Sequence, residues 1–107
     1  MKIFIAGPRA VNELDECVKQ KLKNICTKQY EVFVGDADGI DSCIQKYMQS
    51  KNYKNVTIFA SNGIARNNFG EWRVEYVNVA HNITGFEFYI QKDLEMAKQA
   101  DIGFMIW

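Results

Sequence analysis

The sequence predicts an α/β fold with a doubly wound, mostly parallel sheet of about five strands and helices on both faces. Short apolar runs alternate with amphipathic stretches along the chain, an order typical of parallel strands joined by crossover helices. The chain has 48% hydrophobic residues and one proline, a composition typical of a globular protein. Its 107 residues fit one domain, residues 1–107, and not two.

Three apolar runs in the first half are expected to form buried parallel strands. They are KIFIA (residues 2–6), YEVFVG (30–35) and NVTIFA (55–60). Each run is short, rich in β-branched or aromatic residues, and followed by a polar or glycine-containing turn. Connections between these runs are short, which favours a right-handed strand–helix–strand order.

Two amphipathic stretches between these strands predict helices. In the first, Asn12 is expected to be the N-cap, with acidic residues in the first turn, where the helix dipole favours negative charge: Glu13, Asp15 and Glu16. Helical spacing predicts the buried face of this helix to be Leu14, Val18, Leu22 and Ile25. The second helix is expected to end at residues 50–52 and to bury Ile40, Ile44, Tyr47 and Met48.

The second half predicts a loop, a strand, a turn, a helix and a last strand. The loop covers residues 61–72 and is rich in Asn and Gly, and AHNITG (80–85) is the turn. Residues 72–79 are expected to form a strand, although the spacing of the aromatic residues there also suits a helix. The helix spans residues 86–100 with Phe86, Ile90, Leu94 and Ala97 on its buried stripe. The strand spans 102–107, and we expect the fold to continue after it or a partner to cover this edge.

Composition narrows the classes of partner and the cellular location. The 13 basic and 13 acidic residues balance, which argues against a protein that mainly coats nucleic acid or an anionic membrane. The apolar stretch at the N-terminus is too short for a signal peptide or a membrane span. Cys17, Cys26 and Cys43 form no C-x-x-C pair, and we expect reduced, mostly packed thiols in a cytoplasmic protein.

The stretch GDADGID, residues 35–41, is the strongest candidate for a ligand site. Its glycines allow close backbone approach, and the helix that follows directs N–H groups and its positive end outward, a geometry that suits a phosphate. The aspartates would repel a phosphate but suit ribose hydroxyl groups. A purely structural turn, capped by Asp38 or Asp41, explains the same residues, and the spacing matches no standard phosphate loop.

Two arginines are expected at the same edge of the sheet. Arg9 follows the first strand in GPR, and Arg66 lies in the loop after the third strand. Because the carboxyl ends of parallel strands meet at one edge, either guanidinium could neutralise a phosphate bound there. A solvated surface role is the alternative for each.

These segments together resemble the SLOG superfamily of Rossmann-like proteins. GPR, GDADGID and KDLEMAKQAD carry the resemblance, which spans nearly the whole chain. The superfamily includes cytokinin-activating phosphoribohydrolases, whose pattern ahead of an apolar strand is matched by Lys92, Asp93, Met96, Ala100 and Asp101. Lys92 stands where those enzymes carry arginine, and their Gly-Gly-x-Gly-Thr loop would follow Trp107.

Two other families share shorter motifs with the chain. KIFIAGP is similar to the start of nucleoside 2-deoxyribosyltransferases, and Gly39, Ile40 and Asp41 are similar to a motif of the single-stranded-DNA-binding protein of natural transformation. The central glutamates Glu71, Glu75 and Glu87 lie in no nucleophile context.

The resemblance implies a domain that binds a nucleotide or a nucleotide-derived small molecule. The residues expected to bind it are Gly7, Pro8, Arg9, Gly35, Asp36, Ala37, Asp38, Gly39, Asp41, Arg66, Asn67 and Lys92. Two alternatives remain: an N-glycosidase with Asp41 as the catalytic carboxylate, or a scaffold that forms homo-oligomers through its sheet edge. No cofactor is expected, and His81 has no neighbouring ligand residue that would predict a metal site.

Overall fold

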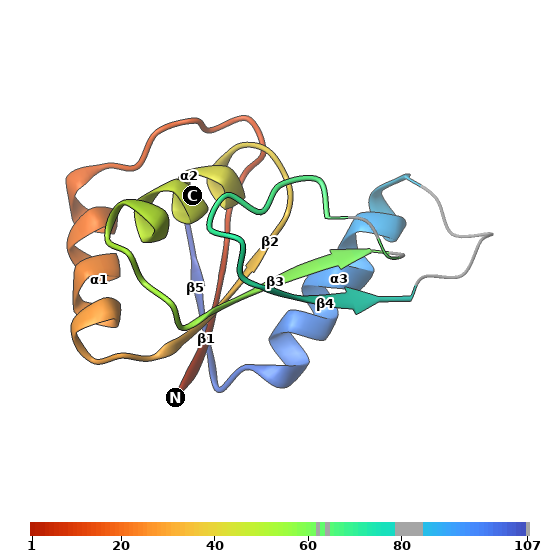
Figure 1. Cartoon of the computed structure of the whole chain (residues 1–107). Helices are drawn as coiled ribbons and strands as arrows, with labels where there is room; N and C mark the ends of the chain where they lie inside the picture. Colours follow the sequence, from red (N-terminus) through yellow and green to blue (C-terminus); the bar gives the residue numbers. More distant parts are fainter. Residues whose placement is uncertain (62, 64, 79–84, 107) are drawn as a thin grey trace.

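Five strands and three helices follow one another along the chain in the computed structural model, which describes residues 1–61, 63, 65–78 and 85–106 (Figure 1). The strands are β1 (Lys2–Ala6), β2 (Glu31–Gly35), β3 (Val56–Ser61), β4 (Arg73–Val77) and β5 (Ile102–Met105). The helices are α1 (Glu16–Thr27), α2 (Ile40–Ser50) and α3 (Gly85–Gln99). The predicted α/β fold and the order of its elements are confirmed.

All five strands form one parallel sheet in the order β4-β3-β2-β1-β5. Strands β1 to β4 are added successively in one direction, and β5 then pairs with the other side of β1. The direction of winding therefore reverses at the β1–β5 pair, and in sheets of this kind ligands bind beside such a point, outside the carboxyl ends of the strands.

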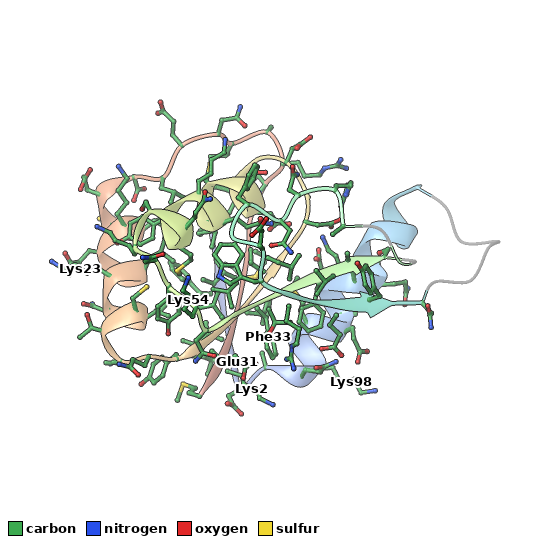
Figure 2. The ribbon with its side chains drawn as sticks, viewed as in Figure 1. Lys2, Lys23, Glu31, Phe33, Lys54 and Lys98 are labelled. Carbon is green, nitrogen blue, oxygen red and sulfur yellow. The ribbon has the colours of Figure 1, made fainter. Side chains whose placement is uncertain are left out.

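Helices cover both faces of the sheet, with α1 and α2 on one face and α3 on the other (Figure 1). Alternation along β1 explains this arrangement: Ile3 and Ile5 join the larger core with α1 and α2, whereas Phe4 packs on the α3 side. On the second face, Phe33, labelled in Figure 2, packs with Phe59 and Met96. The strands have apolar residues on both faces, as the continuous apolar runs predicted.

The first helix begins later than the sequence suggested. Asp15, not Asn12, is the N-cap of α1, and its Oδ1 accepts a hydrogen bond of 2.8 Å from the Val18 N–H. Leu14 consequently precedes the helix, although it still packs against the core. Aspartate and asparagine are comparable caps, so residue type alone did not distinguish position 15 from position 12.

The buried face of α3 is also different from the predicted stripe. Leu94 is 56% exposed and Ala97 is exposed, whereas Lys92 and Met96 are buried against the sheet. The spacing of apolar residues predicted the wrong face of α3, because one of the residues on the buried side is the charged Lys92. For residues 85–89 the structure describes the backbone only, so the predicted burial of the Phe86 side chain lies outside the described part of the chain.

Three further expectations concern the loops, the cysteines and the sheet edge. The strand predicted at residues 72–79 is confirmed as β4, and of the turn predicted at 80–85 only Gly85, the first residue of α3, is described. All three cysteines are free, but Cys17 is exposed and not packed. The edge strand β5 exposes Ile102 and Met105. Within the described part of the chain, no helix has the length and apolar character needed to cross a membrane.

Candidate functional site

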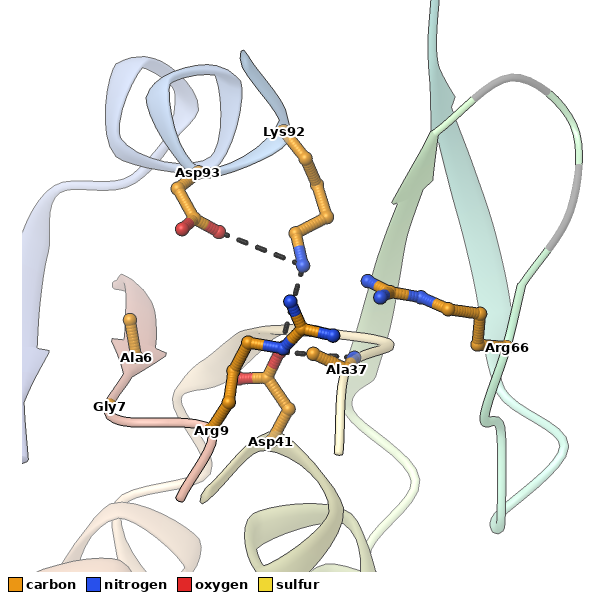
Figure 3. Close-up of a pocket in the computed structure, with 8 residues that line it drawn as sticks. All are labelled: Ala6, Gly7, Arg9, Ala37, Asp41, Arg66, Lys92 and Asp93. Atoms are coloured by element: carbon orange, nitrogen blue, oxygen red, sulfur yellow. Dashed lines mark hydrogen bonds and ion pairs between the residues drawn. The ribbon is translucent and has the colours of Figure 1, made fainter. Parts of the chain in front are cut away.

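A small pocket of about 60 Å³ lies at the carboxyl edge of the sheet (Figure 3). It collects residues from the end of β1 and the turn after it, the β2–α2 turn, the first turn of α2, the β3–β4 loop and the middle of α3. The lining residues are Ala6, Gly7, Arg9, Ala37, Asp41, Arg66, Lys92 and Asp93. The predicted meeting of Arg9, the GDADGID turn and Arg66 at one edge is therefore observed.

The turn after β1 is held directly against the turn after β2. Gly39 has a φ of 77°, and a side chain there would collide with the backbone of Arg9. The N–H of Ile40 donates a hydrogen bond of 3.2 Å to the carbonyl of Pro8. Glycine is thus required at position 39 both for its left-handed conformation and for this close approach.

Asp36, at the end of β2, is a buried centre that ties two other segments together. Its carboxylate accepts hydrogen bonds from Arg66 Nη2 at 2.9 Å, Arg66 Nε at 3.2 Å and the Arg66 backbone N–H at 2.9 Å. Lys92 Nζ lies 3.5 Å from the same carboxylate. Burial raises the pKa of Asp36, but these hydrogen bonds and charges outweigh it and hold the pKa below its usual range.

Lys92 projects from α3 into a ring of carboxylates. Its side chain is 4% exposed, and Nζ lies 3.5 Å from Asp36, 3.6 Å from Asp41 and 3.7 Å from Asp93. A side chain at Gly35 would collide with the Asp41 carboxylate and the Lys92 ammonium. Gly35 therefore permits the approach of two charged side chains that a larger residue would keep apart.

Asp41 is the carboxylate of GDADGID that lines the pocket. One of its oxygens accepts a hydrogen bond of 3.2 Å from the Ala37 N–H and lies 3.6 Å from Lys92 Nζ. Burial raises the pKa of Asp41 to about 6, against the lowering effects of Lys92 and of the Ala37 N–H. The buried carboxyl group can thus gain or lose a proton close to neutral pH.

Asn67 and Gln45 hold the β3–β4 loop over the site. Asn67 Nδ2 donates to the Asp36 carbonyl at 2.9 Å and to Asp38 Oδ1 at 3.2 Å. The fully buried Gln45 donates to the Gly35 and Asn67 carbonyls and accepts from the Phe69 N–H at 3.0 Å. These bonds tie the loop to the β2–α2 turn and to α2, and they fix the position from which Arg66 reaches the pocket.

The predicted ligand-binding residues fall into two groups. Six line the pocket: Gly7, Arg9, Ala37, Asp41, Arg66 and Lys92. The other six support it or flank it: Pro8, Gly35, Asp36, Asp38, Gly39 and Asn67. The phosphate was expected at backbone amides around Gly35 and Gly39, and two amides of this turn, those of Ala37 and Ile40, already donate hydrogen bonds within the chain. Asp36 likewise pairs with Arg66 and Lys92.

Sequence reasoning missed three residues of the site. Asp93 and Ala6 line the pocket, and Gln45 supports the loop. Asp93 adjoins Lys92, a predicted site residue, in the segment KDLEMAKQAD, which was a usable signal. Gln45 was detectable as a polar residue beside the apolar stripe of α2, four residues after Asp41.

Three described residues, Glu71, Trp72 and Glu75, are not part of the lining of this pocket. Trp72 is buried and donates from its indole N–H to the Tyr53 carbonyl at 2.8 Å, so it belongs to the core. Glu71 is exposed, and Glu75 accepts a hydrogen bond from Gln99. The side chains of His81, Phe86, Glu87, Phe88 and Tyr89 lie outside the described part of the structure.

A second groove, wider than the pocket, is lined by other residues. The groove, of about 530 Å³, is lined by Asn12, Glu13, Leu14, Lys19, Cys43, Lys46 and Tyr47 and contains no predicted site residue. Across residues 1–61, 63, 65–78 and 85–106, no three His, Cys, Asp or Glu side chains are placed to hold a metal ion. In the pocket the carboxylates surround the Lys92 ammonium instead.

Comparisons with known proteins returned no match of significance among protein-family models, curated proteins or solved structures.

Proposed function

We propose that this chain binds a nucleotide or a nucleotide-derived small molecule at the carboxyl edge of its sheet, as a sensor domain of the SLOG type. The observation that supports this proposal is the pocket itself, which three cationic side chains, Arg9, Arg66 and Lys92, line from separate elements. It lies at the end of β1, beside the point where the winding of the sheet reverses. Such convergence at a strand edge is typical of anion-binding sites in α/β proteins.

The residues divide the recognition of the ligand between them. Arg9 and Arg66 are the exposed cations of the pocket. Arg9 would contact phosphate oxygens, for which a guanidinium is well suited, and Arg66, whose Nε and Nη2 donate to Asp36, would add its positive charge. Asp38 is exposed at the rim and would accept hydrogen bonds from ribose hydroxyl groups. Asp36 holds Arg66 and Lys92 in place by pairing with both, which removes it from direct contact with the ribose.

A thermal-shift measurement with AMP, ADP-ribose and NAD tests the proposal. A ligand at a hundred times its dissociation constant adds roughly 2.7 kcal/mol to the stability, a shift of several degrees in a domain of this size. Arg9→Ala is expected to abolish the shift. Its matched control is Arg73→Ala, which removes an exposed arginine at the opposite, amino-terminal end of β4 and should leave the shift unchanged. The absence of a shift with all three ligands would contradict the proposal.

A second candidate function, N-glycosidic bond cleavage, is favoured by the position of Asp41. Asp41 lines the pocket with a pKa of about 6, suitable for proton transfer or for stabilising an oxocarbenium-like sugar as the base departs. Water would add to the sugar carbon, and the base would leave with a proton. Release of ribose 5-phosphate from AMP that is lost in Asp41→Asn would support this function. Binding without turnover would favour the sensor.

A further inference from the structure

The size of the pocket limits which part of a ligand can enter it. Its volume of about 60 Å³ is on the order of two water molecules, whereas sites that enclose whole drug-sized ligands measure roughly 300–1,000 Å³. A whole nucleotide would extend beyond this volume. A single compact oxyanion, such as the terminal phosphate of a nucleotide, matches the volume, and the remainder of the ligand would lie outside along the rim.

The charges around Asp41 come from every element that packs against it. Lys92 and Asp93 face it from α3, Asp36 from the end of β2, Arg9 from the turn after β1 and Arg66 from the β3–β4 loop. Three cations and two carboxyl groups, those of Asp41 and Asp93, thus line the pocket, and the Asp36 carboxylate pairs with two of these cations. An anion placed among them gains attraction from the cations but meets repulsion from each carboxylate that stays ionised.

Asp41 is the carboxyl group best placed to remove part of this repulsion. It is buried, it lines the pocket, and burial raises its pKa to about 6, so protonation near neutral pH requires little free energy. The carboxylate of Asp36 is held in its ionised form by Arg66. Burial also raises the pKa of Asp93, but its side chain is half-exposed and therefore better screened by solvent.

We propose that the pocket binds one terminal, phosphoryl-sized oxyanion and that Asp41 takes up a proton as the anion binds. This inference rests on the proposed function and specifies the ligand group and its regulation by pH. A bound anion disfavours the charged form of Asp41, so the complex holds more protons than the free protein. Affinity therefore increases as the pH falls towards about 6 and levels off below the pKa of the free protein.

Sulfate is the probe that isolates this effect, because it keeps both negative charges across the tested range, whereas a phosphate monoester itself titrates near pH 6. Binding of sulfate, and of AMP in parallel, would be measured at about pH 5.5, 7 and 8. We expect the affinity of the native chain for sulfate to rise roughly tenfold from pH 8 to pH 5.5, the size of a one-unit change in pKa. Calorimetry in two buffers of different ionisation enthalpy would show net uptake of about half a proton between pH 6 and 7, the amount that a one-unit rise in pKa produces.

Two variants assign the proton to its residue. Asp41→Asn should bind sulfate at pH 8 as tightly as the native chain does at pH 5.5, with no dependence on pH. Asp93→Asn removes a carboxyl group from the same pocket and should keep the dependence. If sulfate binds in the pocket with the same affinity at every pH, or if the dependence on pH survives Asp41→Asn, this inference alone is overturned. If neither AMP nor sulfate binds the native chain or Asp41→Asn at any pH, the proposed function fails with it.

Discussion

Asp36 and Asp41 show how one short turn gives the same side chain two opposite properties. Both are buried beside Lys92, but Arg66 donates three hydrogen bonds to Asp36, whereas Asp41 accepts one from the Ala37 N–H. The pKa of Asp36 is consequently lowered despite its burial, and burial raises that of Asp41 to about 6. The two residues should therefore respond to pH in opposite directions.

Asp41→Asn is predicted to stabilise the fold at high pH. A carboxyl group whose pKa is raised in the folded state contributes stability that is present below its unfolded pKa and lost as the pH rises through about 6. At pH 8 the native chain is destabilised because Asp41 is ionised while buried, whereas the uncharged amide of the variant avoids this penalty. We expect the variant to be more stable by about 1–3 kcal/mol at pH 8 and almost equal to the native chain near pH 4, as measured by urea unfolding. A loss of stability at pH 8 would show that pairing with Lys92 outweighs burial.

Asp36→Asn is predicted to have the opposite effect. Its lowered pKa contributes stability that is present above the unfolded pKa and lost as the pH falls. The substitution leaves Lys92 and Arg66 without their shared partner, and breaking such a buried pair costs on the order of 2–4 kcal/mol at pH 7. Asp38→Asn, an exposed neighbour, should change the unfolding free energy by less than about 0.5 kcal/mol. Equal effects of the two variants would argue against the central role of Asp36.

At the scale of single elements, the strands were easier to predict than the faces of the helices. Each of the first three strands is a short apolar run, and such a strand can be predicted without knowing which side chains lie on which face of the sheet. The buried face of α3 depended on Lys92, whose burial is explained by carboxylates from β2 and α2 that lie about 50 residues away along the chain. Local hydrophobicity contains no information about such partners.

The observed buried face of α3 differs from the predicted one, so substitutions of two apolar residues on this helix should have unequal effects on stability. Met96 is fully buried against Phe33 and Phe59, so Met96→Ala should cost about 2–4 kcal/mol. Leu94, which the predicted stripe placed in the core, is 56% exposed, and Leu94→Ala should cost less than about 0.5 kcal/mol. Urea unfolding of both variants measures the difference. A larger loss of stability in Leu94→Ala than in Met96→Ala would instead support the buried face that hydrophobicity predicted.

At the scale of the whole molecule, the location of the site was predictable but its internal pairing was not. A parallel sheet brings the ends of its strands to one edge, so the meeting of Arg9, GDADGID and Arg66 follows from the order of the elements. The pairing of Asp36 with Arg66 and the position of Gln45 under the loop depend on side-chain packing in three dimensions. The aspartates expected to meet ribose hydroxyls are for this reason mostly engaged within the protein.

The distribution of charge over the whole chain predicts weak binding to polynucleotides. Acidic and basic residues number 13 each, and the exposed lysines labelled in Figure 2, Lys2, Lys23, Lys54 and Lys98, come from separate segments of the chain. Affinity for nucleic acid comes mainly from neutralising successive phosphates, and a pocket of about 60 Å³ can hold only one such group. We expect a single-stranded oligonucleotide of about 20 residues to bind with a dissociation constant weaker than roughly 100 μM at 0.15 M salt, by fluorescence anisotropy. Micromolar binding that weakens steeply with added salt would contradict this prediction and indicate a polynucleotide-binding surface.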